Sequence, residues 1–104
     1  MERFLVGAMK AVFIVYNQAS IDKVLDVLRR LGLRGYTRWE RVKGVGSDRG
    51  EPHLGSHTWP AINTAMLVVC EATEASSLMQ ELKAIDESAP EHGLRAYSWE
   101  AQGW

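Results

Sequence analysis

Ala-Val-Phe-Ile-Val-Tyr (residues 11–16) and Thr-Ala-Met-Leu-Val-Val-Cys-Glu (residues 64–71) are the two segments that best indicate the architecture of this chain. Both are short apolar runs, rich in β-branched side chains, and neither alternates regularly between polar and apolar residues. Runs of this kind are typical of central strands that are covered on both faces. The sequence therefore predicts two inner strands of a single sheet.

The segment after the first run has the pattern of an amphipathic helix. Ser20 is placed to cap its N-terminus, and Gly32 supplies the left-handed residue on which helices often end. Between them, apolar residues recur at steps of three and four, which marks one buried face. These residues are Ile21, Val24, Leu25, Leu28 and Leu31.

A second helix is expected after the run at 64–71, and two further strands complete the pattern. Thr73 is placed to cap this helix, and Ser88-Ala89-Pro90 ends it. Residues 36–45 predict a strand whose imperfect alternation indicates a bulge or partial exposure. Residues 94–99 predict the last strand. The apolar residues of the second helix are Ala75, Leu78, Met79, Leu82 and Ile85.

The order β-α-β-β-α-β predicts an α+β domain of the ferredoxin-like class, with a four-stranded antiparallel sheet. Two right-handed crossovers place both helices on one face of that sheet. The other face is too apolar to remain in water, so a second copy of the chain is expected to pack on it. Residues 1–8 are expected to be an N-terminal extension of one domain that spans residues 9–104.

Composition and charge narrow the classes of function. The net charge of −1 does not favour nucleic acid as a partner, and no apolar run is long enough to span a membrane. The single cysteine, Cys70, excludes an internal disulfide and suits the cytoplasm. The charge is uneven, with a basic segment at 29–49 and an acidic one at 71–104. This asymmetry allows head-to-tail contact between copies or an anionic ligand on the basic strand. The alternative is that these charges only form a solvated, mixed surface.

The segment 44–60 is rich in turn-forming residues and long for a compact domain, which is typical of a functional loop. Two of its residues, His53 and His57, are spaced to bind a divalent transition metal such as copper or zinc, or are simply exposed loop histidines. No nucleophile–base–acid set is apparent, so catalysis is not expected. Three tryptophans on or beside this loop and its flanking strands are expected at contacts between subunits. They are Trp39, Trp59 and Trp99.

Residues at the start of the basic strand and at its end suit an anionic ligand such as a nucleotide. Glycine amides can approach phosphate closely, and a threonine hydroxyl can read a base edge. The alternative is that the glycines only form turns and the threonine only belongs to a strand. The candidates are Thr37, Arg38, Gly44 and Gly46.

Gly35-Tyr36-Thr37, followed by Val42-Lys43-Gly44-Val45-Gly46 and a loop, resembles the nitrogen regulatory protein P-II superfamily over about residues 9–100. The resemblance implies a homotrimer that binds an adenine nucleotide in clefts between subunits. It also implies a T-loop-like segment at about 44–62, of which residues 46–62 would contact a transporter or an enzyme. The chain departs from the family pattern by one extra residue between Thr37 and Gly44. It also lacks the glycine-lysine segment that normally holds phosphates before the last strand, and the C-terminal arginine pair.

Two further motifs are similar to the divalent-ion-tolerance (CutA) proteins, which have the same fold and are also trimers. They are Ser56-His57-Thr58-Trp59 and Tyr97-Ser98-Trp99. This second resemblance implies metal binding by the loop histidines. Three hypotheses therefore remain open: a nucleotide-binding regulatory protein, a metal-binding module, and a trimeric scaffold that binds no ligand.

Overall fold

The computed structural model of the protein describes residues 8–42 and 63–104, and within them the expected order of elements is confirmed. The two inner strands are longer than the apolar runs that predicted them. Short 3-10 turns precede α1 and β4. The elements are β1 (Met9–Asn17), α1 (Ile21–Arg30), β2 (Thr37–Val42), β3 (Asn63–Glu71), α2 (Ala72–Ser88) and β4 (Arg95–Ala101).

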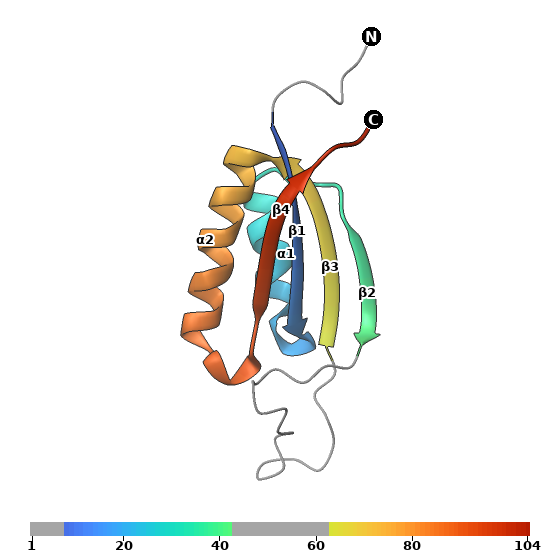
Figure 1. Ribbon diagram of the computed structural model, residues 1–104. Helices are drawn as coiled ribbons and strands as arrows, with labels where there is room; N and C mark the ends of the chain where they lie inside the picture. The colour runs from blue at the N-terminus through green and yellow to red at the C-terminus, as the bar shows by residue number, and fades with distance from the viewer. Residues whose placement is uncertain (1–7, 43–62) are drawn as a thin grey trace.

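The four strands form one antiparallel sheet in the order β2-β3-β1-β4, so β1 and β3 are central as predicted. Figure 1 shows that α1 and α2 both lie on one face of this sheet and leave the other face open. β2 and β4 are the two edges. The ferredoxin-like α+β architecture is therefore confirmed.

The hydrophobic core fills the space between the helices and the sheet. Alternate residues of β1 and β3 point towards the helices, and Val12, Ile14, Met66 and Val68 are completely buried there. Leu78 of α2 is equally buried. Cys70 also lies in this core, as expected for a structural thiol, and burial raises the pKa of its side chain.

Both helix starts differ from the sequence-based expectation. Ser20 does precede α1, but its hydroxyl makes no capping bond and lies 3.3 Å from Nδ1 of His92 instead. Thr73 does not cap α2, because the helix already begins at Ala72. The backbone N–H of Glu71 donates to Oε1 of Glu74 at 3.1 Å. Glu71 and Glu74 therefore form a capping box at the N-terminus of α2.

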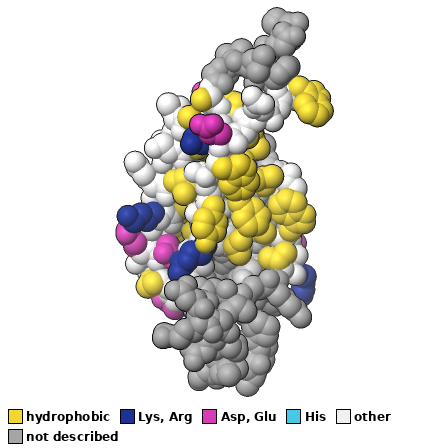
Figure 2. All heavy atoms as spheres, viewed as in Figure 1, with side chains coloured by type: hydrophobic (Ala, Val, Ile, Leu, Met, Phe, Trp, Pro, Cys, Tyr) yellow, Lys and Arg dark blue, Asp and Glu magenta, His cyan; other side chains and the backbone are white. Residues whose placement is uncertain are grey.

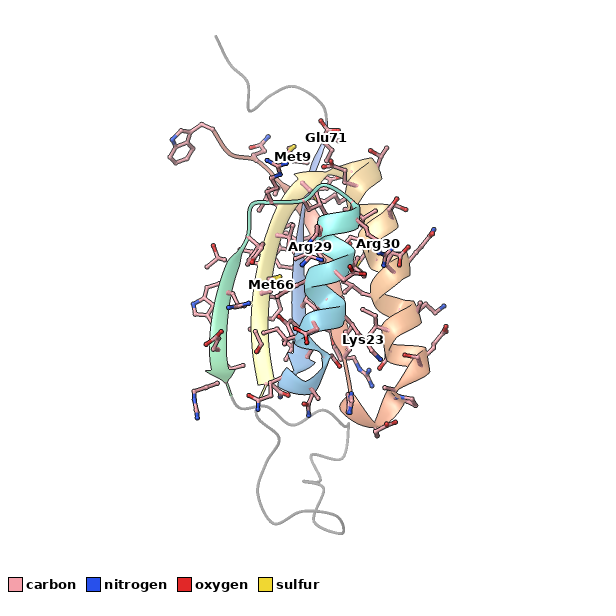
Figure 3. The ribbon with its side chains drawn as sticks, turned by 180° about the vertical axis from the view of Figure 1, so that it is seen from behind. Met9, Lys23, Arg29, Arg30, Met66 and Glu71 are labelled. Atoms are coloured by element: carbon pink, nitrogen blue, oxygen red, sulfur yellow. The ribbon has the colours of Figure 1, made fainter. Side chains whose placement is uncertain are left out.

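The start of the described chain is hydrogen-bonded to the first residue of α2. The N–H of Ala72 donates to the carbonyl oxygen of Ala8 at 2.9 Å, so residue 8, the last of the predicted extension, is bonded to the domain. Figure 3 shows Met9 and Glu71 side by side at this end, in agreement with their pairing in the sheet. Residues 1–7 lie outside the described residues.

β2 begins at Thr37 and not at Tyr36, and it contains the expected bulge. Glu40 pairs with Thr64 and Val42 with Asn63, so Arg41 is the extra residue on this strand. Arg41 has a φ of 62°, in the left-handed region that few non-glycine residues adopt. The part of the predicted strand after Val42 lies outside the described residues.

Candidate ligand and assembly site

The open face of the sheet carries a continuous apolar surface, which we call the open face below. Strand pairing arranges it in rows across the sheet. One row runs from Tyr97 through Phe13 and Leu67 to Thr37, and the next ends at Trp39. Figure 2 shows the hydrophobic side chains gathered over the strands on this side. The apolar side chains of the open face are Ala11, Phe13, Val15, Trp39, Ala65, Leu67, Val69, Tyr97 and Trp99, and the polar residues Thr37 and Arg95 lie on its edge strands.

Three large aromatic side chains of the open face are about half exposed to solvent. Trp39 is 46% exposed, Trp99 49% and Tyr97 58%. Large aromatic groups contribute most when they are buried at contacts between subunits. The structure thus brings two of the three predicted interface tryptophans, Trp39 and Trp99, onto the same surface, whereas Trp59 lies outside the described residues.

The two described ligand candidates lie on opposite faces of the edge strand β2. Thr37 belongs to the open face, where it pairs with Leu67. Arg38 points to the helix side, and its guanidinium bonds Oε2 of Glu40 at 2.9 Å. Strand alternation therefore separates the threonine from the arginine. The glycines Gly44 and Gly46 lie outside the described residues.

A shallow hollow of about 450 Å³ lies where the connection from β1 to α1 meets the end of β2. Asn17 lines it from the end of β1, Gln18 lines it from the connection, and Glu40 and Arg41 line it from β2. The bond between Ser20 and His92 joins the same connection to the segment that precedes β4. The sequence had not indicated this link, because the two residues are 72 positions apart.

Tyr16 is a buried polar group that sequence reasoning treated only as part of an apolar strand. Its side chain is 1% exposed, and its hydroxyl has no hydrogen-bond partner among the described residues. Burial raises the pKa of Tyr16 to about 12, and this effect is partly offset by the nearby positive charge of Arg38. A buried hydroxyl without a partner costs stability.

Replacing Tyr16 by Phe is expected to leave the free energy of unfolding at neutral pH unchanged or to raise it by about 1 kcal/mol, because this removes a buried hydroxyl that has no partner among the described residues. The pKa of Tyr16 is higher in the folded chain than the ordinary value of 10.0. The stability that the folded chain gains by keeping Tyr16 neutral is therefore fully present below pH 10, and it is lost as pH rises towards 12. Urea unfolding at pH 7, 10 and 11.5 should show the wild type losing on the order of 2 kcal/mol more than Tyr16→Phe over this range. Parallel losses in the two proteins would contradict this assignment.

Within residues 8–42 and 63–104, no three histidine, cysteine or carboxylate side chains are grouped as a metal site would require. The predicted ligands His53 and His57 lie outside these residues, so metal binding through them stays a prediction. No described helix is both long and apolar enough to cross a membrane.

The sequence of the chain matches the model of a known protein family. The family model described as nitrogen regulatory protein P-II matches residues 9–93. Comparison with curated protein sequences finds no match.

Solved structures with the same fold include regulatory proteins with bound ligands. CPII from Thiomonas intermedia K12, bound to ADP, AMP and acetate, superposes with a TM-score of 0.74 at 17% identity, over 94% of this chain and 90% of that one. The Bacillus subtilis GlnK–ATP complex gives 0.66 at 14% identity, over 93% and 84%. A putative PII-like signalling protein from Thermus thermophilus gives 0.64 at 23% identity, over 93% and 90%.

Proposed function

Because the chain belongs to the nitrogen regulatory protein P-II family, we propose that it is a non-enzymatic regulatory protein that binds a small effector between the subunits of a homotrimer. The observation that carries this proposal is the open face, which is apolar, aromatic and uncovered in one protomer. Further copies of the chain would bury it and would create clefts at the sheet edges. The lone cysteine supports a cytoplasmic setting for this role.

The effector that fits this proposal best is an adenine nucleotide. Two proteins of the same fold are described with ADP and AMP or with ATP, and one of them also with acetate. Thr37 is exposed on the edge strand β2, where a hydroxyl can hydrogen-bond a ligand held between subunits. The segment at 46–62 is proposed to contact a partner protein, a transporter or an enzyme, when the effector is bound.

Isothermal titration of the wild type with ADP, AMP and ATP, each with and without acetate, tests the proposal. Binding of at least one nucleotide is expected, and Thr37→Ala should weaken it about fivefold, which corresponds to one lost hydrogen bond of about 1 kcal/mol. Thr73→Ala is the matched control, because Thr73 is an exposed threonine at the start of α2. The absence of heat with every nucleotide would overturn the nucleotide assignment.

A further inference from the structure

A groove lies between α2 and β4 on the helix side of the sheet, away from the open face, and we call it the α2–β4 groove. Its volume is about 380 Å³, comparable with that of pockets that hold small ligands. Figure 1 shows α2 running alongside β4, and residues of the helix and of the edge strand form the two walls. The apolar residues that line the groove are Met79, Leu82, Leu94 and Ala96.

Three charged side chains line the same groove, and one of them is poorly hydrogen-bonded. They are Lys83, Asp86 and Arg95. Oδ1 of Asp86 is buried and has no hydrogen-bond partner among the described residues. Oδ2 of Asp86 has a long contact of 3.5 Å with Nη1 of Arg95, and this nitrogen already donates to the carbonyl oxygen of Leu94 at 2.7 Å. A buried carboxylate oxygen without a donor costs free energy, so a ligand that supplies a donor here gains affinity.

A ligand in the groove can reach this carboxylate through a small movement of one side chain. The side chain of Asp86 is 29% exposed, so the carboxylate is not sealed in the core. The last torsion of an aspartate side chain is broad and nearly two-fold. Either oxygen of Asp86 can therefore turn towards a donor in the groove.

The signs of the three charges select the class of ligand. A simple cation would be repelled by Lys83 and Arg95, and a simple anion would be repelled by Asp86. A zwitterion satisfies both signs, with its ammonium group on Asp86 and its carboxylate group on Lys83. None of the ion pairs within residues 8–42 and 63–104 includes Lys83, so its ammonium group is available for this contact.

The apolar lining selects the rest of the molecule. A polar group placed against these side chains would lose its hydrogen bonds with water, whereas an apolar group gains from leaving water. Met79 is unbranched and flexible, so this wall can adapt to the shape of an apolar group. We propose that the α2–β4 groove binds an apolar α-amino acid, such as leucine.

This second effector site goes beyond the proposed function, because it is separate from the proposed nucleotide cleft. Thr37 lies on the open face, on the edge strand β2, whereas the groove lies on the helix side beside β4. The two sites can therefore be tested independently of each other.

Isothermal titration of the wild type with L-leucine and three analogues, without nucleotide, tests the proposal. Saturable binding of leucine is expected. 4-Methylpentanoate lacks the ammonium group, 3-methylbutylamine lacks the carboxylate group, and L-glutamine has a polar side chain. Each analogue should bind about tenfold more weakly or worse, because it loses a charge-assisted hydrogen bond or an apolar contact. The absence of saturable heat with leucine up to about 10 mM, or an analogue that binds as tightly as leucine, would overturn the proposal.

Substitutions in the groove locate the binding. Asp86→Asn is expected to weaken leucine binding about tenfold or more, since the amide keeps the shape of the side chain but not its charge. Lys83→Gln should weaken it roughly two- to fivefold, because this lysine is exposed. Circular dichroism should confirm that both variants fold.

Glu87→Gln is the matched control, because Glu87 is an exposed carboxylate next to Asp86 that does not line the groove. It should bind leucine like the wild type. The assignment to this groove fails if Asp86→Asn binds leucine as the wild type does, or if Glu87→Gln weakens binding as much as Asp86→Asn. Titration of Asp86→Asn with the nucleotides should match the wild type, which separates failure of this inference from failure of the proposed function.

Discussion

Phe13→Glu is expected to leave the protein as folded single protomers, with association weakened by a factor on the order of a thousand. Phe13 lies at the centre of the open face, paired with Leu67 on one side and Tyr97 on the other. A carboxylate buried there without a partner would cost several kcal/mol on assembly, whereas in the lone protomer it remains in water. Sedimentation velocity at micromolar concentration measures the loss directly.

The control for this substitution is Ser76→Glu, which adds the same charge on the exposed side of α2. It should sediment like the wild type. Circular dichroism should show that Phe13→Glu keeps its secondary structure, since the side chain packs against no helix. A Phe13→Glu protein that sediments with the mass of the wild-type assembly would show that the open face is not the contact between copies.

Leu78→Ala is expected to lower the free energy of unfolding by about 2–5 kcal/mol. Leu78 is completely buried between α2 and the sheet. The loss combines the apolar surface that is no longer removed from water with the cavity that remains. For a domain of this size, each kcal/mol lowers Tm by roughly 4–8 °C.

Urea unfolding should compare Leu78→Ala with Lys83→Ala, an exposed position on the same helix. All samples need one protomer concentration, because self-association adds to apparent stability. The control should stay within about 0.5 kcal/mol of the wild type. A loss below about 1 kcal/mol for Leu78→Ala would mean that the core around α2 repacks freely.

The architecture could be predicted because the strongest signals in the sequence agree with one another. The runs at 11–16 and 64–71 are central strands, and the apolar steps from Ile21 to Leu31 define the buried face of α1. The open face follows from topology alone, since two helices on one side of a sheet leave its other side uncovered. Resemblance to the P-II family added the expectation of a trimer, which remains a proposal.

Features that depend on side chains meeting across the fold could not be read from the sequence. Ser20 has the right identity for a cap, but its hydroxyl faces His92, which no local pattern indicates. Glu71 is the last residue of an apolar run and of β3. Its backbone N–H donates to the side chain of Glu74 in the first turn of α2. The unpaired hydroxyl of Tyr16 is likewise visible only once its described surroundings are known.

The candidate ligand residues stay a prediction, but the structure shows how two groups of them are arranged. Thr37 and Arg38 are neighbours in sequence and were grouped as one anion-binding set, but strand alternation sends them to opposite faces. Trp39 and Trp99 are far apart in the sequence and share a face, because β2 and β4 alternate in phase with the central strands. The remaining candidates, Gly44, Gly46, His53, His57 and Trp59, lie outside the described residues.

The bulge at Arg41 has a consequence for how this strand tolerates a change in length. An inserted residue in a regular strand would move every side chain beyond it to the opposite face of the sheet. Here the surplus residue is absorbed in a single left-handed step, so that Glu40 and Val42 keep adjacent partners on β3. Thr37 and Trp39, which precede this step, therefore keep the orientation that their regular pairing with β3 gives them.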